Sequence, residues 1–262
     1  MKVERGKWTA ERERNSEKIW LQFQRSGQDG VWIPLPAGQP ASIAAGREVR
    51  FELHRAAGTF SFTGTFDGSG PGAKGSGTYT FQPDPAFARE MESLGHRLPS
   101  GDKLLDLAIR DVSPDYNREM QALGYRDLSL SRLSELRAHD VTPQMIRDLA
   151  DLGYRDVPVE RLLEFRMYDV SPALIRELEK LGYNHLPAGQ LVDFRLQNVT
   201  PTFIREMADL GYRNLSAQQL VELRTQGVDV AYVRELQSQG YRNLTPAQLI
   251  ERRMYHSASS RR

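Results

Sequence analysis

The sequence predicts an α+β protein in two parts: a small antiparallel β domain over residues 1–83 and an α-solenoid of six 29-residue helix-turn-helix repeats over residues 84–256. Two observations predict this fold class. Apolar and polar residues alternate through the first part, as they do in strands. Proline and glycine recur at a constant interval through the second part, as they do in repeat arrays. Residues 257–262 are interpreted as a tail.

The alternation in the first part is that of a sheet with one buried face. Ile19, Leu21 and Phe23 occupy alternate positions, with Trp20 and Gln22 between them. Such clean alternation is typical of antiparallel strands that face water on one side. We expect a twisted sheet, sandwich or half-barrel of five or six strands. Further strands are expected at residues 7–9, 31–33, 49–53, 60–66 and 79–81.

Residues 67–77 are rich in glycine, and residues 70–75 formally match the dinucleotide-binding pattern G-x-G-x-x-G. That pattern binds phosphate only where a helix follows, because the helix N-terminus holds the pyrophosphate. Here a strand is expected to follow at residues 78–81. The segment is therefore interpreted as a hairpin loop rather than as a phosphate site.

The repeats are defined by columns of residues that recur every 29 positions. The prolines are Pro85, Pro114, Pro143, Pro172 and Pro201, and Val230 takes the sixth place. The glycines are Gly95, Gly124, Gly153, Gly182, Gly211 and Gly240. An aromatic residue follows each glycine: tyrosine in five repeats and His96 in the first.

Each repeat has the boundary signals of two short helices. In the third repeat Thr142 is the expected N-cap, Pro143 the first helical residue and Gly153 the left-handed residue that ends the first helix. The second helix is expected to start at a capping residue three or four positions later. These caps are Ser100, Ser129, Pro158, Pro187, Ser216 and Thr245. Helices of about ten residues are unstable alone, so stacking of the repeats must bury their apolar faces.

Arginine also recurs every 29 positions on the first helix, nearly opposite its apolar stripe, and an acid follows it directly. We expect these side chains to point outward, where a ladder of them can bind an extended acidic partner. The alternative, that they are only solvated, stays open. The residues of this predicted partner-binding surface are Arg118, Arg147, Arg176, Arg205 and Arg234.

A second arginine column lies among the core leucines of the second helix. An inward arginine needs a partner, so we expect these residues to pair with acids of neighbouring helices and to join repeat to repeat. For Arg166 the expected partner is Asp148 or Glu177. The inner column is Arg137, Arg166, Arg195, Arg224 and Arg253. An acidic column is expected to point away from the core: Asp106, Glu135, Glu164, Asp193, Glu222 and Glu251.

Composition excludes several classes of function. The chain has no cysteine, which removes disulfides, thiolate metal sites and cysteine nucleophiles. Its five histidines lack metal-ligand spacing, and nucleophile-elbow and phosphate-loop motifs are absent. With 35 basic and 34 acidic residues the net charge is +1, which argues against nucleic acid as partner. No apolar run reaches the length of a membrane span. We expect no enzyme activity, cofactor, metal or membrane insertion.

The repeat motif V-[ST]-P-x-x-I-R-E-L-x-x-L-G-Y resembles that of helical-repeat proteins of bacteria. These include repeat regions appended to membrane metallopeptidases of the β-lactam-sensor type. The resemblance covers about residues 84–253 and carries no catalytic residue across, because the peptidase motif is absent. It implies a bacterial sensing or interaction module, for which an extracytoplasmic location, with a leader absent from this chain, is favoured over a cytoplasmic one.

These observations favour a non-enzymatic scaffold that binds a protein partner or itself through the repeat surface. In the self-assembly case, Ile250, Met254 and Tyr255 on the last helix are the predicted contact. The alternative is a β domain that binds a glycan or a lipid and is displayed on a helical stalk. Its basis is the set of Trp8, Trp20 and Trp32, although we favour the interpretation that these rings form the core of the sheet.

Overall fold

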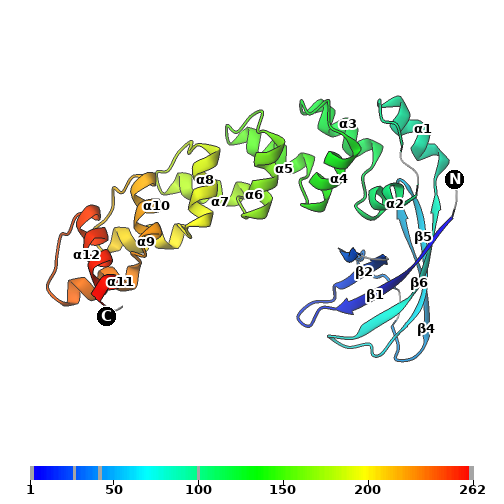
Figure 1. Ribbon diagram of the computed structural model, residues 1–262, viewed down its shortest axis with the longest axis horizontal. Helices are drawn as coiled ribbons and strands as arrows, with labels where there is room; N and C mark the ends of the chain where they lie inside the picture. The colour runs from blue at the N-terminus through cyan, green and yellow to red at the C-terminus, as the bar shows by residue number, and fades with distance from the viewer. Residues whose placement is uncertain (1–2, 26–27, 41–42, 99–100, 260–262) are drawn as a thin grey trace. The chain divides into compact units, whose positions relative to one another are not determined.

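The computed structural model describes residues 3–25, 28–40, 43–98 and 101–259 of the chain. In this part of the chain six strands come first and twelve helices follow (Figure 1). The predicted α+β class, a β domain followed by helical repeats, is confirmed. The molecule forms two compact units that divide inside the repeats. Met1–Ala138 contains the sheet and the first two repeats, and His139–Arg262 contains the others.

The described strands of the first unit form one antiparallel sheet in the order β3-β2-β1-β6-β5-β4. Two meanders, β1–β2–β3 and β4–β5–β6, are joined by the pairing of β1 with β6. Of the forms expected from the sequence, the single sheet is the one observed. The strands are β1 (Glu4–Arg12), β2 (Ile19–Arg25), β3 (Gln28–Pro34), β4 (Glu48–Arg55), β5 (Gly58–Phe66) and β6 (Lys74–Pro83).

The glycine-rich hairpin is shorter than predicted, because β6 begins at Lys74 and includes residues expected in the loop. A Cβ atom on Gly77 would lie 2.0 Å from the carbonyl oxygen of Thr63 on β5. A Cβ atom on Gly75 would lie 2.7 Å from the ring of Phe66. Glycine is therefore required here by close approach within the sheet, and not by a turn.

Aromatic rings fill the buried face of the sheet. Trp8, Phe23, Phe60 and Phe62 are each at most 1% exposed. The rings of Phe51 and Phe62 stack with centroids 4.6 Å apart, and those of Phe23 and Phe60 lie 5.0 Å apart. Large rings bury more apolar area per residue than aliphatic side chains, which suits a small sheet. The predicted alternation thus identified the buried face correctly.

Each repeat contributes two helices, which have eight or nine residues except for α12 with 14. The first helices are α1 (Pro85–Ser93), α3 (Pro114–Ala122), α5 (Pro143–Asp151), α7 (Pro172–Lys180), α9 (Pro201–Asp209) and α11 (Val230–Ser238). The second helices are α2 (Asp102–Ile109), α4 (Leu130–Ala138), α6 (Val159–Met167), α8 (Ala188–Leu196), α10 (Ala217–Thr225) and α12 (Pro246–Ser259). In the second unit first helices pack on first helices and second helices on second helices, from α5 and α6 through to α11 and α12.

The predicted helix boundaries are confirmed at the third repeat. The amide of Met145 donates to the hydroxyl oxygen of Thr142 at 3.1 Å, as expected of an N-cap. Gly153 has φ +88°, and the amide of Tyr154 donates to the carbonyl of Leu149 at 2.9 Å, which closes the helix. The expected cap Ser216 is also confirmed, and it forms a capping box with Gln219 in α10. The predicted cap Ser100 lies outside the described residues.

Candidate interaction surfaces

The outward arginine column lies on the first helices as predicted, and its five members are exposed. Acids of the preceding repeat accompany it, 28 positions earlier in the chain. Arg118 contacts Glu90 at 2.8 Å, Arg234 contacts Glu206 at 3.2 Å, and Arg205 contacts Glu177 at 3.7 Å. Positive and negative side chains therefore alternate along this face, so that an acidic partner would compete with acids already in place.

Hydrogen bonds from the Arg118 guanidinium to Glu90 and Asp115 raise the pKa of this arginine. The interaction is electrostatically favourable even though the side chain is exposed to solvent. Exposed pairs of long side chains nevertheless contribute little to stability, because water screens them and ordering them costs entropy. Binding of an acidic partner at this column stays a prediction.

The inner arginines join consecutive repeats, but through different partners from those predicted. Arg166 donates from Nε to the carbonyl of His139 at 2.9 Å and from Nη2 to Asp140 at 2.6 Å. The expectation of Asp148 or Glu177 is therefore wrong. Those acids lie on first helices, whereas the guanidinium reaches the turn formed by His139 and Asp140.

The same arginine clamp recurs along the array, as a bond from Nε to a carbonyl 27 positions earlier and a bond from Nη2 to a carboxylate 26 positions earlier. Arg195 binds the carbonyl of Tyr168 and the carboxylate of Asp169, both at 2.8 Å. Arg137 binds the carbonyl of Arg110 and the carboxylate of Asp111, both at 3.3 Å. The planar guanidinium suits this two-point contact with a helix end.

The position that supplies the carboxylate of the clamp at Asp111, Asp140 and Asp169 has a left-handed backbone in five repeats. Its φ values are +55° at Asp111, +53° at Asp140, +55° at Asp169, +54° at Asn198 and +72° at Gly227. Aspartate, asparagine and glycine are the residues that adopt this conformation most readily. Sequence reasoning missed this column, although the series Asp, Asp, Asp, Asn, Gly at 29-residue steps was a signal that could have found it.

Arg55 on β4 connects the sheet to the first clamp. It lies 3.5 Å from the carboxylate of Asp111, which also receives Arg137. Burial lowers the pKa of Arg55; the nearby charge of Arg137 lowers it further, and Asp111 opposes both. One carboxylate thus compensates two partly buried guanidinium groups where the sheet and the repeats meet.

The tyrosine column has a second role beyond helix capping. The hydroxyl of Tyr154 donates to the carbonyl of Leu186 at 2.7 Å, and that of Tyr183 donates to the carbonyl of Leu215 at 2.8 Å. In each case the acceptor belongs to the next repeat, 32 positions later. Tyrosine is therefore required by its hydroxyl as well as by its ring.

Two exceptions to the repeat pattern contact one another. His96 stands in the tyrosine column and Asn117 in the isoleucine column, and the side-chain amide nitrogen of Asn117 lies 2.8 Å from Nε2 of His96. Asn117 is 1% exposed, so its amide needs this partner. This contact gives His96 a structural role in the first repeat.

The outer face of the second helices in the second unit carries acids together with exposed apolar side chains. Met167, Leu196 and Met254 are 60%, 52% and 51% exposed and occupy the same position in their repeats. An acid precedes each by three positions, and Glu222 precedes Thr225 in the same way. We call this surface the acidic–apolar ridge: Glu164, Met167, Asp193, Leu196, Glu222, Glu251 and Met254.

The predicted self-association residues lie on α12. Ile250 is half-buried, Met254 is exposed, and Tyr255 is 68% exposed. Nearby, the guanidinium of Arg252 lies 3.9 Å from the ring centroid of Tyr241, a favourable cation–π geometry. Self-association through these three residues stays a prediction.

The three tryptophans of the β domain have different environments. Trp8 is 1% exposed and belongs to the core, whereas Trp20 and Trp32 are 37% and 46% exposed on neighbouring strands. The exposed pair lines a surface hollow of about 320 Å³ together with Glu11, Glu13 and Arg14. Reading all three rings as core was therefore wrong for Trp20 and Trp32, because they alternate with buried Leu21 and Ile33.

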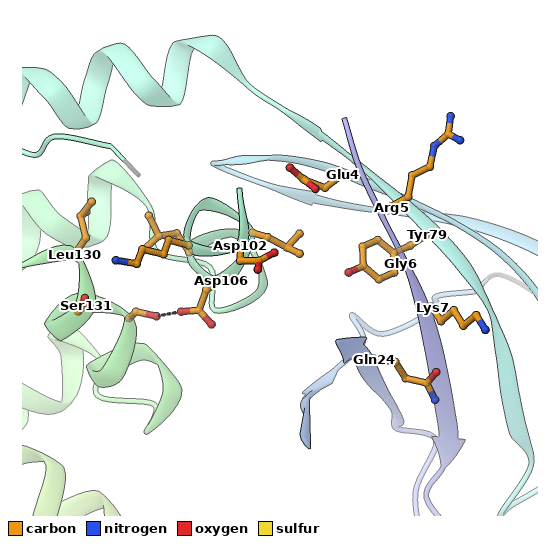
Figure 2. A pocket seen from close by; sticks show the side chains of 14 residues that line it. Glu4, Arg5, Gly6, Lys7, Gln24, Tyr79, Asp102, Asp106, Leu130 and Ser131 are labelled. Atoms are coloured by element: carbon orange, nitrogen blue, oxygen red, sulfur yellow. Dashed lines mark hydrogen bonds between the residues drawn. The ribbon is translucent and has the colours of Figure 1, made fainter. Parts of the chain in front are cut away.

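A larger cleft of about 790 Å³ lies in the first unit between β1 and the helices α2 and α4 (Figure 2). Tyr79 is directed from the sheet toward α2, where Asp106 accepts a hydrogen bond from Ser134 at 2.6 Å. A Cβ atom on Gly6 would lie 2.5 Å from the Tyr79 ring, so a residue without a side chain is needed here to avoid a clash with that ring. The ends of Arg5 and Lys7 point away from Asp106, so the charged groups do not converge on one point.

Within the described ranges, no group of three or more histidine or acidic residues is arranged to hold a metal ion. Among the helices described, none is both long and apolar enough to cross a membrane. No protein-family model matches the chain, and a search of curated proteins finds no match. The similarity to bacterial helical-repeat proteins therefore stays a prediction from the motif.

Proposed function

We propose that the protein is a non-enzymatic scaffold that binds another protein chain along the exposed surface of its helical repeats. The observation that carries this proposal is the row of exposed apolar side chains at Met167, Leu196 and Met254. Single exposed apolar residues are common on folded proteins, but a row at a constant step is a feature of binding surfaces. The joints between repeats do not need these side chains, because the arginine clamps and tyrosine hydroxyls lie elsewhere.

Affinity capture with the full chain tests this proposal. Wild-type protein and the variant Met167→Lys/Leu196→Lys are immobilised and exposed to extract of the source cell, and captured proteins are identified by mass spectrometry. We expect a partner that is retained by the wild type and lost from the variant. The matched control is Arg176→Lys/Arg205→Lys, which changes the first-helix face and conserves its charge. A wild-type chain that retains nothing beyond the background of the variant, and that sediments as a monomer, contradicts the scaffold.

Self-assembly is a special case of the same proposal. Sedimentation velocity over a range of concentrations is expected to show larger species for the wild type and fewer for Met254→Lys/Tyr255→Ser. A monomer at all concentrations contradicts self-assembly and leaves binding of a different protein as the function.

A second candidate is glycan binding by the β domain, favoured by the exposure of Trp20 and Trp32 beside Glu11 and Arg14. Flat aromatic rings can stack on sugar rings, and the flanking charged groups can bond to hydroxyls. We choose a glycan over a lipid because carboxylates line the hollow. Titration of intrinsic tryptophan fluorescence with soluble polysaccharides tests it. We expect quenching that is lost in Trp20→Ala/Trp32→Ala, and the absence of any change in the wild type contradicts it.

A further inference from the structure

We propose that the acidic–apolar ridge of the second unit binds a basic amphipathic helix of another protein. The inference rests on the proposed scaffold function and names its surface and the chemistry of its partner. The partner helix would place one apolar side chain over each exposed Met or Leu, and Lys or Arg side chains beside the acids.

The first step concerns which side of each helix the ridge occupies. On α6, Glu164 precedes Met167 by three positions, and on α8 Asp193 precedes Leu196 by three. Residues three apart lie on the same side of a helix, about one turn from each other. Between them, Phe165 and Phe194 are buried on the opposite side. Acid and apolar side chain therefore face the same way, out of the array.

The second step concerns continuity. The helices α6, α8, α10 and α12 pack side by side in that order. Packed helices lie about 8–10 Å apart, so the ridge repeats at about that distance. A partner helix rises about 1.5 Å per residue, or about 10.5 Å over seven residues. An apolar residue every seventh position of the partner can thus meet Met167 and Leu196 in turn.

The third step concerns charge. In the part of the chain that the structure describes, Asp193, Glu222 and Glu251 form no ion pair, whereas Glu177 and Glu206 on the first helices are paired with arginines. Arg195, next to Leu196 on α8, holds Asp169 and the carbonyl of Tyr168 instead. Of the ridge acids, Glu164 is paired with Arg161 on its own helix, so the charge that selects Lys and Arg in a partner comes from Asp193, Glu222 and Glu251.

The fourth step concerns the apolar residues. Their column contains Thr225 in the fifth repeat, so the second unit does not require an apolar residue at this position; in the first unit the same position is Ile109, which is buried in the core. Methionine side chains are flexible and polarisable, which suits them to packing against a partner's side chains. A charged residue at this position would keep the array soluble without exposing an apolar side chain to water. Packing against the surface of a partner explains why apolar side chains occur at this position.

Selection from a displayed peptide library, with the full chain as bait, tests the inference. We expect enriched peptides with apolar residues every seven positions, flanked by Lys and Arg. A synthetic peptide of that pattern should bind with an affinity at least about tenfold higher than for Met167→Lys/Leu196→Lys, since two apolar contacts are lost. The variant Asp193→Asn/Glu222→Gln conserves packing and should reduce both the affinity and its dependence on salt. Circular dichroism checks that each variant is folded.

The outcomes separate this inference from the scaffold itself. Enrichment of acidic peptides whose binding is lost in Arg205→Ala/Arg234→Ala would contradict the proposal that the ridge is the binding surface. It would still support a scaffold, with the outward arginines as the binding surface. Basic peptides that bind the lysine variant as well as the wild type also overturn it. A library from which no peptide is enriched, together with a failed affinity capture, contradicts both proposals.

Discussion

The outer and inner arginine columns have the same 29-residue step, and they differ in what surrounds the guanidinium. In the inner column, Arg195 is 30% exposed and contacts both a carbonyl and a carboxylate of the preceding repeat. In the outer column, Arg234 is 59% exposed and contacts one acid, Glu206. The inner arginine satisfies the end of a helix whose carbonyls lack partners, while the outer one meets only another long side chain. Whether a recurring arginine holds the repeats together or only lies at the surface therefore depends on the group that it contacts.

The sharpest test of this difference is Asp111→Asn, which conserves tolerance of the left-handed backbone and removes the charge that Arg55 and Arg137 share. We expect a loss of about 2 kcal/mol in the free energy of unfolding, less than the ~3–5 kcal/mol of a fully buried pair. Urea unfolding measures it. Asp169→Asn is the matched control, and because its carboxylate is 77% exposed the effect should be well below half as large. Equal effects at both sites would contradict the special role of the sheet junction.

The substitution Arg195→Lys conserves charge and removes the planar two-point contact. We expect a loss of about 1 kcal/mol, the value of one hydrogen bond to a charged or carbonyl partner. Thermal unfolding compares this variant with Arg205→Lys on the outer column, for which no measurable change is expected. Equal melting temperatures of the two variants would contradict a role for the planar two-point contact of the inner column in stability.

The tyrosine hydroxyls provide a joint without charge. Tyr183→Phe removes the hydrogen bond to the carbonyl of Leu215 and should lower the free energy of unfolding by about 1 kcal/mol. Tyr241→Phe, for which no hydroxyl bond is seen in the described residues, should lower it by almost nothing.

Burial also raises the pKa of Tyr183 and Tyr154 above the ordinary 10.0. The folded protein then holds the phenol proton more tightly than the unfolded chain, so stability is unchanged below about pH 10 and falls as pH rises through the raised pKa. A spectrophotometric titration with a normal tyrosine pKa throughout would refute this.

The smallest effect is expected at the outer column. Arg234→Ala removes the contact with Glu206 and should change the free energy of unfolding by less than about 0.5 kcal/mol. The difference should vanish in about 1 M salt, where the screening length is only about 3 Å. Urea unfolding at low and high salt measures it. A large loss in the free energy of unfolding that persists in high salt would show that the outer column stabilises the fold as the inner column does.

The sequence was a reliable guide wherever a residue acts on its own helix or strand. Thr142 caps the helix that it precedes, Gly153 ends it, and Leu21 faces the core because its neighbours in the strand do not. These roles depend on positions a few residues away. The partner of Arg166 was not predictable in the same way, because the pairing of residues 26 and 27 positions apart depends on how one repeat is offset against the next.

For the candidate surfaces, the outward direction of Arg205 and Arg234 followed from helical geometry alone, but the acids that accompany them did not. The exposure of Met167 and Leu196 was missed, because each lies four positions after a buried residue, Leu163 or Val192, and so fits the helical pattern of a core stripe. The exposure of Trp20 and Trp32 had a signal in the alternation of β2, which placed Trp20 opposite the buried face.

By itself the sequence determined the order of the two parts, the repeat length, the helix ends and the direction of each side chain about its own axis. Those properties are local, and a chain of L-residues settles them over a few positions. The tertiary structure decided which acid each arginine meets, which tryptophans reach solvent and which apolar column stays uncovered. Such pairings depend on the stacking of helices that are distant in sequence, and local periodicity carries no information about that offset.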